Sequence, residues 1–390
     1  MRGDEAIHGN HAAVHIEARG IVFDSRARPA AERVACFTSL CRLGDGAVIC
    51  GFQLGSGKHA PDSTIRLCRS RDEGGTWDEL PARFSTAYAG VAGSLAAPEL
   101  VEVEPRRLLL FATWFDRSDP ERPLFDPVTE GILRSKQLWA VSHDEGRSWS
   151  DWTELATPGL TGCATTGPAF AWPDGSVVYA FESFKEFDDP RPARHAAWVV
   201  VSRDGGHSFG EPLLVAQHPQ QQVYYWDQRL CATGRHAELF ALFWTHDRAK
   251  RRDLCVHSRR VVITSNGVVG GAIQETSIPG QIAAPLVLDD GRTLAFVVDR
   301  RGPCTLKLWS SRDGGCTCLE GDCLTVYTHD ERAALSQGVE NIDFAQYWED
   351  MGKWSFGHPA IRALPDGRVL LVYYAGSPGC LSVHWAQVRV

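Results

Sequence analysis

One octapeptide occurs four times in this chain, and this repetition constrains the fold more than any other feature. The copies begin at Ser70, Ser142, Ser202 and Ser311 and fit the pattern Ser-x-Asp-x-Gly-x-(Ser/Thr)-aromatic, with Cys318 replacing the aromatic residue in the last copy. The Asp can bond nearby backbone N–H groups and the Gly tolerates positive φ, so the pattern predicts a tight turn. Four such turns indicate an architecture built from copies of one unit.

The octapeptide resembles the Asp-box, or BNR repeat, of the sialidase (neuraminidase) superfamily, whose members are β-propellers. The resemblance implies an all-β fold, a six-bladed β-propeller of four-stranded antiparallel blades forming one domain over residues 1–390. Alternating apolar runs and hairpin turns support strands throughout. The blades are expected at about residues 38–81, 96–156, 165–216, 227–276, 284–327 and 358–390.

Two segments stand outside these six repeats. The last blade is one strand short, and a strand at residues 15–24 is expected to complete it and close the ring, which removes an exposed sheet edge. Residues 331–353, between the last two blades, are rich in Ala, Leu and Glu and are expected to form a short helix or a lid.

Composition narrows the range of functions. The chain has 40 Lys and Arg against 48 Asp and Glu, and a net charge of −8 argues against general nucleic-acid binding. No apolar stretch approaches the roughly 18 residues of a membrane span, and the first residues lack the apolar core of a signal peptide. We therefore expect a cytoplasmic protein with neither a membrane nor a nucleic acid as partner.

Cysteine usage points to a reducing compartment and gives no metal site. Twelve cysteines in a chain of 390 residues are expected to be largely unpaired thiols, and four of them lie in apolar strand patterns (Cys50, Cys68, Cys231 and Cys255). The set formed by Cys316, Cys318, Cys323 and His329 matches no usual zinc-finger spacing. No phosphate-binding glycine loop occurs either, so we expect no metal and no cofactor.

Loops at one end of a propeller's inner strands surround a central pocket, and polar residues gather at these positions. Glu182 ends the apolar strand Val177–Phe181, and the period-two spacing of Asp227 and Arg229 points both side chains the same way. The predicted catalytic residues are Asp62, Glu182, Asp227 and His358. The predicted substrate-binding residues are Tyr225, Trp226, Arg229, Trp244, His246, Arg300 and Tyr374.

The resemblance to sialidases does not extend to most of their catalytic residues. Sialidases bind the substrate carboxylate with three arginines and use a Tyr nucleophile, a helper Glu and an acid/base Asp. Cys36 stands at the place of the first arginine, His358 at that of the Tyr and Tyr225 at that of the Glu, while Asp62 matches the Asp. The resemblance therefore implies no useful hydrolysis of sialosides.

The sequence favours a glycoside hydrolase acting on a small saccharide of unknown identity, acidic sugars included. Two alternatives stay open: a non-catalytic propeller that binds a glycan or a protein, and a lyase that cleaves polysaccharides of uronic-acid type. The oligomeric state is not indicated. Each candidate residue also has a purely structural interpretation, since Glu182 and Asp227 can form ion pairs, Trp226 and Trp244 can pack between blades, and His358 can be a core residue.

Overall fold

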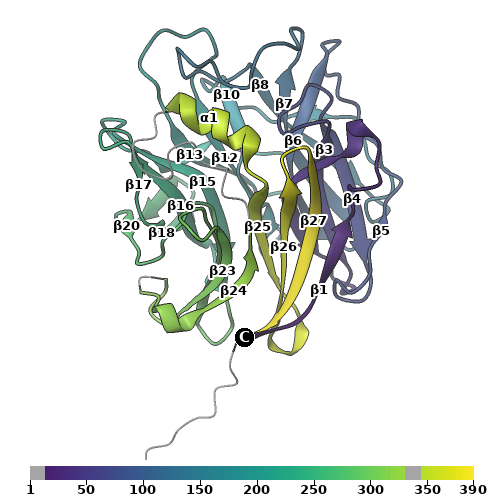
Figure 1. Ribbon diagram of the computed structural model, residues 1–390, viewed down its shortest axis with the longest axis vertical. Coiled ribbons are helices and arrows are strands. Elements are labelled where there is room, and N and C mark those ends of the chain that lie inside the picture. The colour runs from purple at the N-terminus through teal and green to yellow at the C-terminus, as the bar shows by residue number, and fades with distance from the viewer. Residues whose placement is uncertain (1–13, 316, 330–343) are drawn as a thin grey trace, which may run out of the picture.

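The computed structural model describes residues 14–315, 317–329 and 344–390 and is almost entirely β-sheet, with 52% of residues in strands and 4% in helices. Figure 1 shows the sheets arranged side by side around the middle of the molecule, with the helix α1 (Phe344–Lys353) near the top and the C-terminus at the bottom. The all-β prediction is confirmed. Within the described residues, no helix is long and apolar enough to cross a membrane.

Four of the sheets are antiparallel units that follow the chain in order. The first has β6 (Gly93–Glu104), β7 (Arg107–Asp116), β8 (Ser135–Ser142) and β9 (Thr153–Glu154). The second has β10 (Gly162–Thr165), β11 (Phe170–Ala171), β12 (Val177–Phe184), β13 (Ala196–Ser202) and β14 (Leu213–Ala216). The third has β15 (Val223–Ala232), β16 (Glu238–Asp247), β17 (Arg252–Asp253), β18 (His257–Thr264), β19 (Gly267–Gly270) and β20 (Gln274–Glu275). The fourth has β21 (Ala283–Val287), β22 (Thr293–Asp299), β23 (Thr305–Ser311) and β24 (Cys323–Thr328).

The remaining strands form one eight-stranded sheet that contains both ends of the described chain. Its strands are β1 (His15–Phe23), β2 (Val34–Arg42), β3 (Val48–Gly55), β4 (Thr64–Ser70), β5 (Asp78–Glu79), β25 (Phe356–Ala363), β26 (Arg368–Ser377) and β27 (Cys380–Arg389). The expected N-terminal strand is present, since β1 pairs antiparallel with β27. A single parallel bridge between Val34 and Leu381 joins the group β1, β25, β26, β27 to the group β2–β5. Three-residue 3₁₀ helices cover Ala30–Glu32, Glu320–Asp322 and Pro365–Gly367.

Neighbouring sheets pack face to face, and their alternating apolar residues form the core. Phe111 of β7 stacks on Tyr179 of β12 with ring centroids 4.3 Å apart, and both side chains are buried. Apolar clusters of the same kind lie between the other neighbouring sheets. Burial on this scale supplies most of the free energy that stabilises such a fold.

The four octapeptides form one recurring turn. In the first copy, Ser70 Oγ donates to Asp72 Oδ1 at 2.7 Å, the Thr76 N–H donates to the same oxygen at 2.8 Å, and Trp77 Nε1 donates to the Gly74 carbonyl oxygen. Corresponding Ser–Asp bonds occur at Ser142, Ser202 and Ser311. Gly74 has φ +100°, and a Cβ there would lie 2.8 Å from Leu370 of β26, so the turn is pressed against a neighbouring strand.

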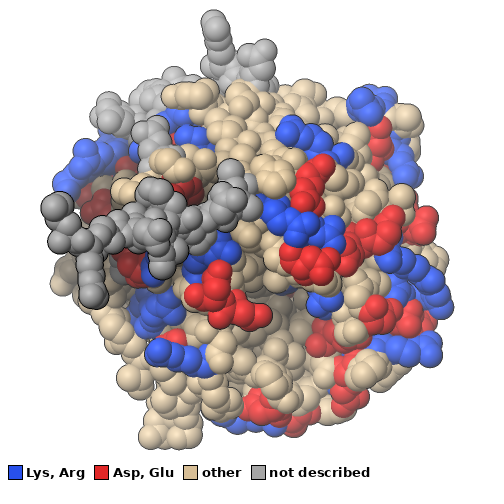
Figure 2. All heavy atoms as spheres, turned by 90° about the horizontal axis from the view of Figure 1, so that it is seen from below, with Lys and Arg blue, Asp and Glu red and all other residues tan. Residues whose placement is uncertain are grey.

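The face of the molecule opposite α1 carries no large patch of one charge. Figure 2 shows this face from below, with acidic and basic side chains interspersed over it. Many charged side chains of the described surface form pairs, such as Arg389 with Glu17 at 2.8 Å. This part of the described surface therefore lacks the basic stripe that a nucleic acid requires.

The cysteines predicted in apolar strands form no disulfide in the structure. Cys50 of β3 and Cys68 of β4 lie opposite each other in the strand register, both buried, and Cys231 lies in β15. The prediction that Cys255 lies in a strand is wrong, because this residue lies between β17 and β18. Its neighbours Leu254 and Val256 donate backbone hydrogen bonds to two different segments, so the chain crosses over at this point.

Four inner strands share one irregularity that shapes the middle of the molecule. The register breaks in β2, β6, β15 and β25, and the first residue of each break has a left-handed backbone: Phe37 (φ 52°), Ala97 (φ 47°), Asp227 (φ 47°) and His358 (φ 50°). Left-handed φ costs a non-glycine residue about 1–2 kcal/mol. Each bulge adds one residue to its strand, so the alternation of side chains between the two faces shifts at this point.

The strain at these bulges is measurable at Ala97, whose side chain is a single methyl group. Ala97→Gly removes the steric cost of the left-handed backbone and should leave the free energy of unfolding unchanged or raise it by up to about 1 kcal/mol. Denaturant unfolding measures this. The matched control is Ala96→Gly on the paired part of β6, which should lower stability by about 1–2 kcal/mol. Equal losses in both variants would contradict the assignment of strain to Ala97.

Candidate functional site

A central cavity of about 80 Å³ lies where the inner strands of four sheets approach one another, and it is large enough for several water molecules. The first residue of every bulge lines it: Phe37 from β2, Ala97 from β6, Asp227 from β15 and His358 from β25. Its other lining residues are His59, Ala96, Thr113, Phe115, Leu124, Phe125, Ile132, Ala164, Thr165, Glu182, Phe184 and Met351. The repeated bulge therefore determines which side chains enter the cavity.

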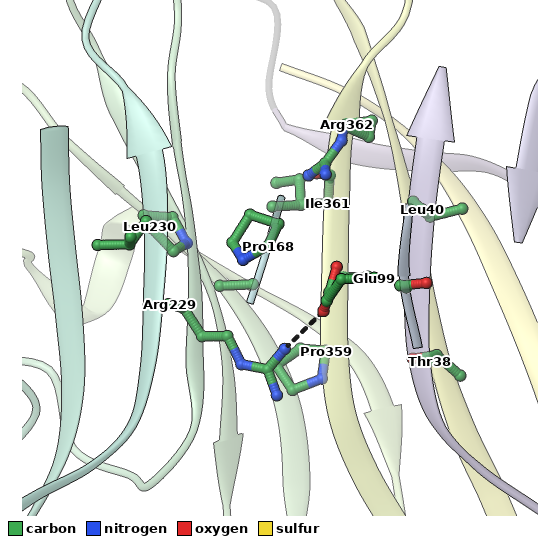
Figure 3. A pocket seen from close by; sticks show the side chains of 13 residues that line it. Thr38, Leu40, Glu99, Pro168, Arg229, Leu230, Pro359, Ile361 and Arg362 are labelled. Carbon is green, nitrogen blue, oxygen red and sulfur yellow. Dashed lines mark hydrogen bonds and ion pairs between the residues drawn. The ribbon is translucent and has the colours of Figure 1, made fainter. Parts of the chain in front are cut away.

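The residues two positions after the bulges line a second, smaller space that we call the lower cavity. Ser39, Glu99, Arg229 and Ala360 occupy these positions, and the lower cavity measures about 20 Å³. Figure 3 shows Arg229 reaching toward Glu99 across this space. Asp227 and Arg229 line different cavities, and the bulge interrupts the period-two spacing from which a common direction was predicted, although the two side chains contact each other.

Arg229 connects the two cavities. Its Nη2 donates to Asp227 Oδ1 at 2.8 Å and to His358 Nε2 at 2.5 Å, and its Nη1 lies 3.6 Å from Glu99 Oε1. The side chains of Arg229 and Glu99 are each only 3% exposed. A buried guanidinium requires such partners because unpaired charge is costly to remove from water.

The hydrogen bonds of His358 define its protonation state. Its Nδ1 lies 3.0 Å from the carbonyl oxygen of Thr38, which can only accept, so Nδ1 carries the hydrogen and Nε2 accepts from Arg229. Burial, followed by the positive charge of Arg229, lowers the pKa of His358 well below its ordinary value. His358 is therefore a neutral acceptor that orients Arg229, and both its ring nitrogens are engaged.

Glu182 and Asp227 approach each other from neighbouring sheets. The backbone N–H of Asp227 donates to Glu182 Oε2 at 3.1 Å, and His195 Nε2 contacts the same oxygen at 2.9 Å. Within the described part of the chain, neither Glu182 Oε1 nor Asp227 Oδ2 has a hydrogen-bond partner. The side chains keep 11% and 22% of their surface exposed, respectively. Each carboxyl group thus has one oxygen anchored by the protein and one available to a ligand.

The two buried carboxyl groups around Arg229 are easier to protonate than free ones. Burial raises the pKa of Asp227 to about 6, although Arg229 opposes the shift, and the negative charge of Glu182 adds to it. Burial likewise raises the pKa of Glu99 to about 7 against the charges of Arg229 and Arg362. A carboxyl group that is partly protonated near neutral pH can donate a proton to a bound molecule.

Helix α1 covers one side of the central cavity and supplies Met351 to its wall. Lys58, in the loop after β3, donates to the carbonyl oxygens of Met351 (3.1 Å) and Trp354 at the C-terminal end of this helix. A cation at this end also interacts favourably with the helix dipole. The prediction of a short helix in residues 331–353 is met by α1, while residues 331–343 lie outside the described part of the chain.

Several predicted site residues lie away from the cavity wall. Trp226, Trp244 and His246 are buried together, with Trp226 stacked on His246 at 5.2 Å and edge-on to Trp244 at 5.0 Å. Tyr225 points to the other face of its strand, against Phe243 and His257. In this arrangement these aromatic rings pack between strands rather than facing the cavity.

Asp62, Arg300 and Tyr374 are likewise occupied by protein contacts. Asp62 is exposed, and its Oδ1 accepts from the backbone N–H and the hydroxyl of Ser56. Arg300 is buried over the Trp354 ring, 4.0 Å from its centroid, and donates to Gln281 and to the Phe356 carbonyl oxygen. The Tyr374 hydroxyl accepts from Lys58 at 2.9 Å, and burial raises its pKa.

Among the residues of the two cavities that the sequence interpretation missed are Glu99, Phe37, His59 and Met351. Two, Phe37 and Glu99, can be traced to a pattern that the inner strands share, because Phe37-Thr38-Ser39-Leu40, Ala97-Pro98-Glu99-Leu100, Asp227-Gln228-Arg229-Leu230 and His358-Pro359-Ala360-Ile361 have the bulge residue first. Aligning them would have placed Phe37 beside His358 and Glu99 beside Arg229, whereas His59 is recognised only from its contact with the Phe37 ring at 5.0 Å. Met351 has no comparable sequence signal.

No metal site emerges from the side chains that the structure describes, since no group of three or more His, Cys, Asp or Glu residues is placed to hold an ion there. Of the zinc-like set considered from the sequence, Cys316 lies outside the described residues.

Comparisons with known proteins identify the fold. No protein-family model matches this chain, and no curated protein matches it in sequence. Among solved structures, a protein of unknown function from Dyadobacter fermentans aligns over 97% of this chain and 99% of its own (TM-score 0.67, 16% identity). The Hadza microbial sialidase Hz136 aligns over 92% of this chain and 66% of its own (TM-score 0.63, 15% identity).

An α-L-arabinanase from Penicillium chrysogenum, solved with arabinobiose, aligns over 96% of this chain and 98% of its own (TM-score 0.59, 13% identity). The sialidase and the arabinanase are propeller glycoside hydrolases, so the distant resemblance to the sialidase fold predicted from the octapeptides is confirmed. At such low identity the likeness shows the fold alone.

The neutral state of His358 can be tested directly by ¹⁵N NMR of the imidazole groups. Because burial and Arg229 both oppose its protonation, we expect His358 to stay neutral, with hydrogen on Nδ1, down to pH 5. The exposed His207 serves as the internal reference in the same spectra. Protonation of His358 with a midpoint near the ordinary histidine pKa of about 6.5 would contradict the arrangement around Arg229.

Proposed function

We propose that this protein is a glycoside hydrolase that binds a small saccharide in the central cavity and cleaves it with Asp227 and Glu182. The observation that carries this proposal is the pair of carboxyl groups on one cavity wall, each with one oxygen fixed and the other unengaged by the described residues. Paired carboxyl groups are what most glycoside hydrolases use to cleave a sugar linkage.

The environments of the two groups suit different roles. Asp227, with its pKa raised to about 6, acts as the acid that protonates the leaving oxygen. Glu182, with Oε2 held by His195 and by the Asp227 N–H, presents its other oxygen to the positive charge that develops on the sugar ring. A water molecule then adds to the anomeric carbon and gives its proton to the carboxylate of Asp227, which restores the acid. Arg229 and His358 keep Asp227 in position and do not themselves touch the substrate.

The same contacts weigh against the lyase alternative. An elimination requires a base at the substrate, and His358 and Tyr374 are the predicted site residues of the types suited to this role. His358 has both ring nitrogens engaged, and the Tyr374 hydroxyl accepts from Lys58. Because neither of these two side chains is free to take a proton, hydrolysis fits the site better.

The proposed arrangement places this site on the axis of a six-bladed propeller. The six blades are the four smaller sheets and the two halves of the eight-stranded sheet, which only the Val34–Leu381 bridge connects. In this count β1 is the outer strand of the last blade and closes the ring by pairing with β27. The four bulged inner strands then face one another around the axis.

Substitution of each carboxyl group separates catalysis from structure. Asp227→Asn and Glu182→Gln should each lower kcat on an aryl glycoside substrate by at least about 100-fold, the usual contribution of a general acid or charged catalytic group. Glu182→Gln should change the melting temperature little, since it keeps shape and hydrogen bonding, whereas Asp227→Asn also removes a charge that pairs with the buried Arg229 and should lower it. Asp78→Asn, in the outer strand β5, is the matched control with an exposed carboxylate.

Retention of full turnover in both variants, accompanied by a fall in melting temperature, would show that the pair is only an ion-pair network. Loss of turnover with unchanged saccharide affinity is the expected pattern. If the wild-type protein binds saccharides without turning any over, the site is a binding site and the catalytic proposal fails.

The pH dependence follows from the protonation of Asp227. The acid must carry its proton, and its pKa is raised to about 6, so kcat/KM should fall about tenfold per pH unit above pH 6. Asp227→Glu, which keeps an acid but alters its surroundings, should shift the pH above which kcat/KM falls. A profile that stays flat from pH 5 to pH 8 would remove Asp227 from the role of acid.

A further inference from the structure

The wall of the central cavity carries negative groups and no positive one among its described residues. Glu182 and Asp227 are its only ionisable carboxyl groups, and neither Lys nor Arg lines it. Its two histidines are uncharged at neutral pH, because burial lowers the pKa of His59 to about 3 and that of His358 well below its ordinary value. Of the charged groups that line this wall, a bound anion would meet only carboxyl groups.

The basic side chains nearest the cavity are committed to protein partners. Arg229 donates to Asp227 and His358 and forms an ion pair with Glu99. Arg300 donates to Gln281 and to the carbonyl oxygen of Phe356. Lys58 donates to the end of α1 and to Tyr374. Arg117 donates to Ser94 Oγ at 2.9 Å and to the carbonyl oxygens of His59 and Arg122. Recruiting any of them for a ligand would break these bonds.

A neighbouring hollow of about 410 Å³ is also mainly acidic. Asp116, Asp119, Glu186 and Asp188 line it together with Arg122 and Arg134, and Arg122 already pairs with Asp119 and Asp188. It borders the central cavity, since Ile132 of the cavity wall forms a bridge with Glu186 of the hollow. Negative charge therefore extends beyond the cavity itself.

Apart from Thr113, Thr165 and the two histidines, the rest of the cavity wall is apolar. Its large apolar side chains come from β2, β7 and β12, from the segment between β7 and β8, and from α1, and they are Phe37, Phe115, Leu124, Phe125, Ile132, Phe184 and Met351. The flat, hydrogen-bearing face of a sugar ring, or an apolar substituent on it, packs favourably on aromatic and aliphatic side chains.

From this distribution we infer that the site selects an uncharged saccharide with an apolar face or substituent and excludes acidic sugars, sialosides and uronic acids alike. This inference rests on the proposed function and narrows its substrate class. It departs from the sequence interpretation, which included acidic sugars. The reason is that the arginines that such sugars require are missing from the wall or are bound elsewhere.

The test uses pairs of aryl glycosides that differ only in charge. The wild-type protein is assayed for turnover and for binding with 4-nitrophenyl glucoside and 4-nitrophenyl glucuronide, as both anomers, and with the corresponding galactoside and galacturonide. 4-Nitrophenyl α-L-arabinofuranoside adds a further uncharged ring, and an aryl sialoside a further acid. Where turnover is absent, the preference for the uncharged glycoside over its acid is obtained as a ratio of affinities, from the competition of the acid against binding of the uncharged member.

We expect each uncharged member to be preferred over its acid at least tenfold, with the ratio shrinking as salt screens the carboxylates. Preference for the acids, or equal use of both, overturns this inference while leaving the proposed hydrolysis intact. Failure to bind either series overturns the proposed function together with the inference.

A single substitution in the wall tests whether the cavity makes this choice. Met351→Arg adds a cation beside the two carboxyl groups and should raise the acid-to-neutral ratio at least fivefold, whereas Met351→Gln, polar but uncharged, should leave the ratio unchanged. An unaltered ratio in Met351→Arg, with binding of the uncharged sugar retained, would show that the discrimination arises elsewhere and would contradict the inference.

Discussion

The site depends on the left-handed bulge that interrupts the inner strands. A regular strand alternates its side chains between two faces, and one bulge residue changes which of them meet at the centre. In β15 the bulge sends Asp227 into the central cavity and Arg229 into the lower cavity, close enough for an ion pair of 2.8 Å. Because the same bulge recurs in β2, β6 and β25, Phe37, Ala97 and His358 reach the cavity at the same level. The backbone strain is thus located where the chemistry is proposed, a common place for it in enzymes.

The positive charge of Arg229 influences the protonation and position of the ionisable side chains next to it. Its positive charge helps to keep His358 neutral, holds one oxygen of Asp227 and compensates Glu99 below. It does so from a buried position, where it cannot also bind a substrate carboxylate. The central cavity is consequently left with carboxyl groups and apolar surface, which suits acid chemistry on an uncharged ring better than recognition of an anion.

The sequence predicts the fold well because its signals are local. The octapeptide turns and the strand that pairs with β27 depend on a few neighbouring residues each, and the structure contains all of them. The site is predicted in part: Glu182, Asp227 and His358 line the cavity and Arg229 lies directly below it. The aromatic residues Tyr225, Trp226 and Trp244, by contrast, pack between strands. Their packing depends on contacts between distant segments, such as that of Trp244 with Trp354, which no local pattern encodes. Asp62 and Glu99 were not predicted correctly for a similar reason, because their surroundings are not set by neighbouring residues alone. Asp62 lies exposed in a closed loop, and Glu99 is buried against Arg229 after the bulge that begins two residues earlier.

The central claim is that a saccharide binds between Asp227 and Glu182, and a crystal structure of the Asp227→Asn variant soaked with an uncharged aryl glycoside tests it most directly. The account predicts the sugar ring in the central cavity, with the glycosidic oxygen within hydrogen-bond distance of the substituted side chain and the ring over Glu182, and its apolar face on the wall formed by Phe37, Phe115 and Met351. Sugar found instead outside the central cavity, with the cavity holding only water, would contradict it.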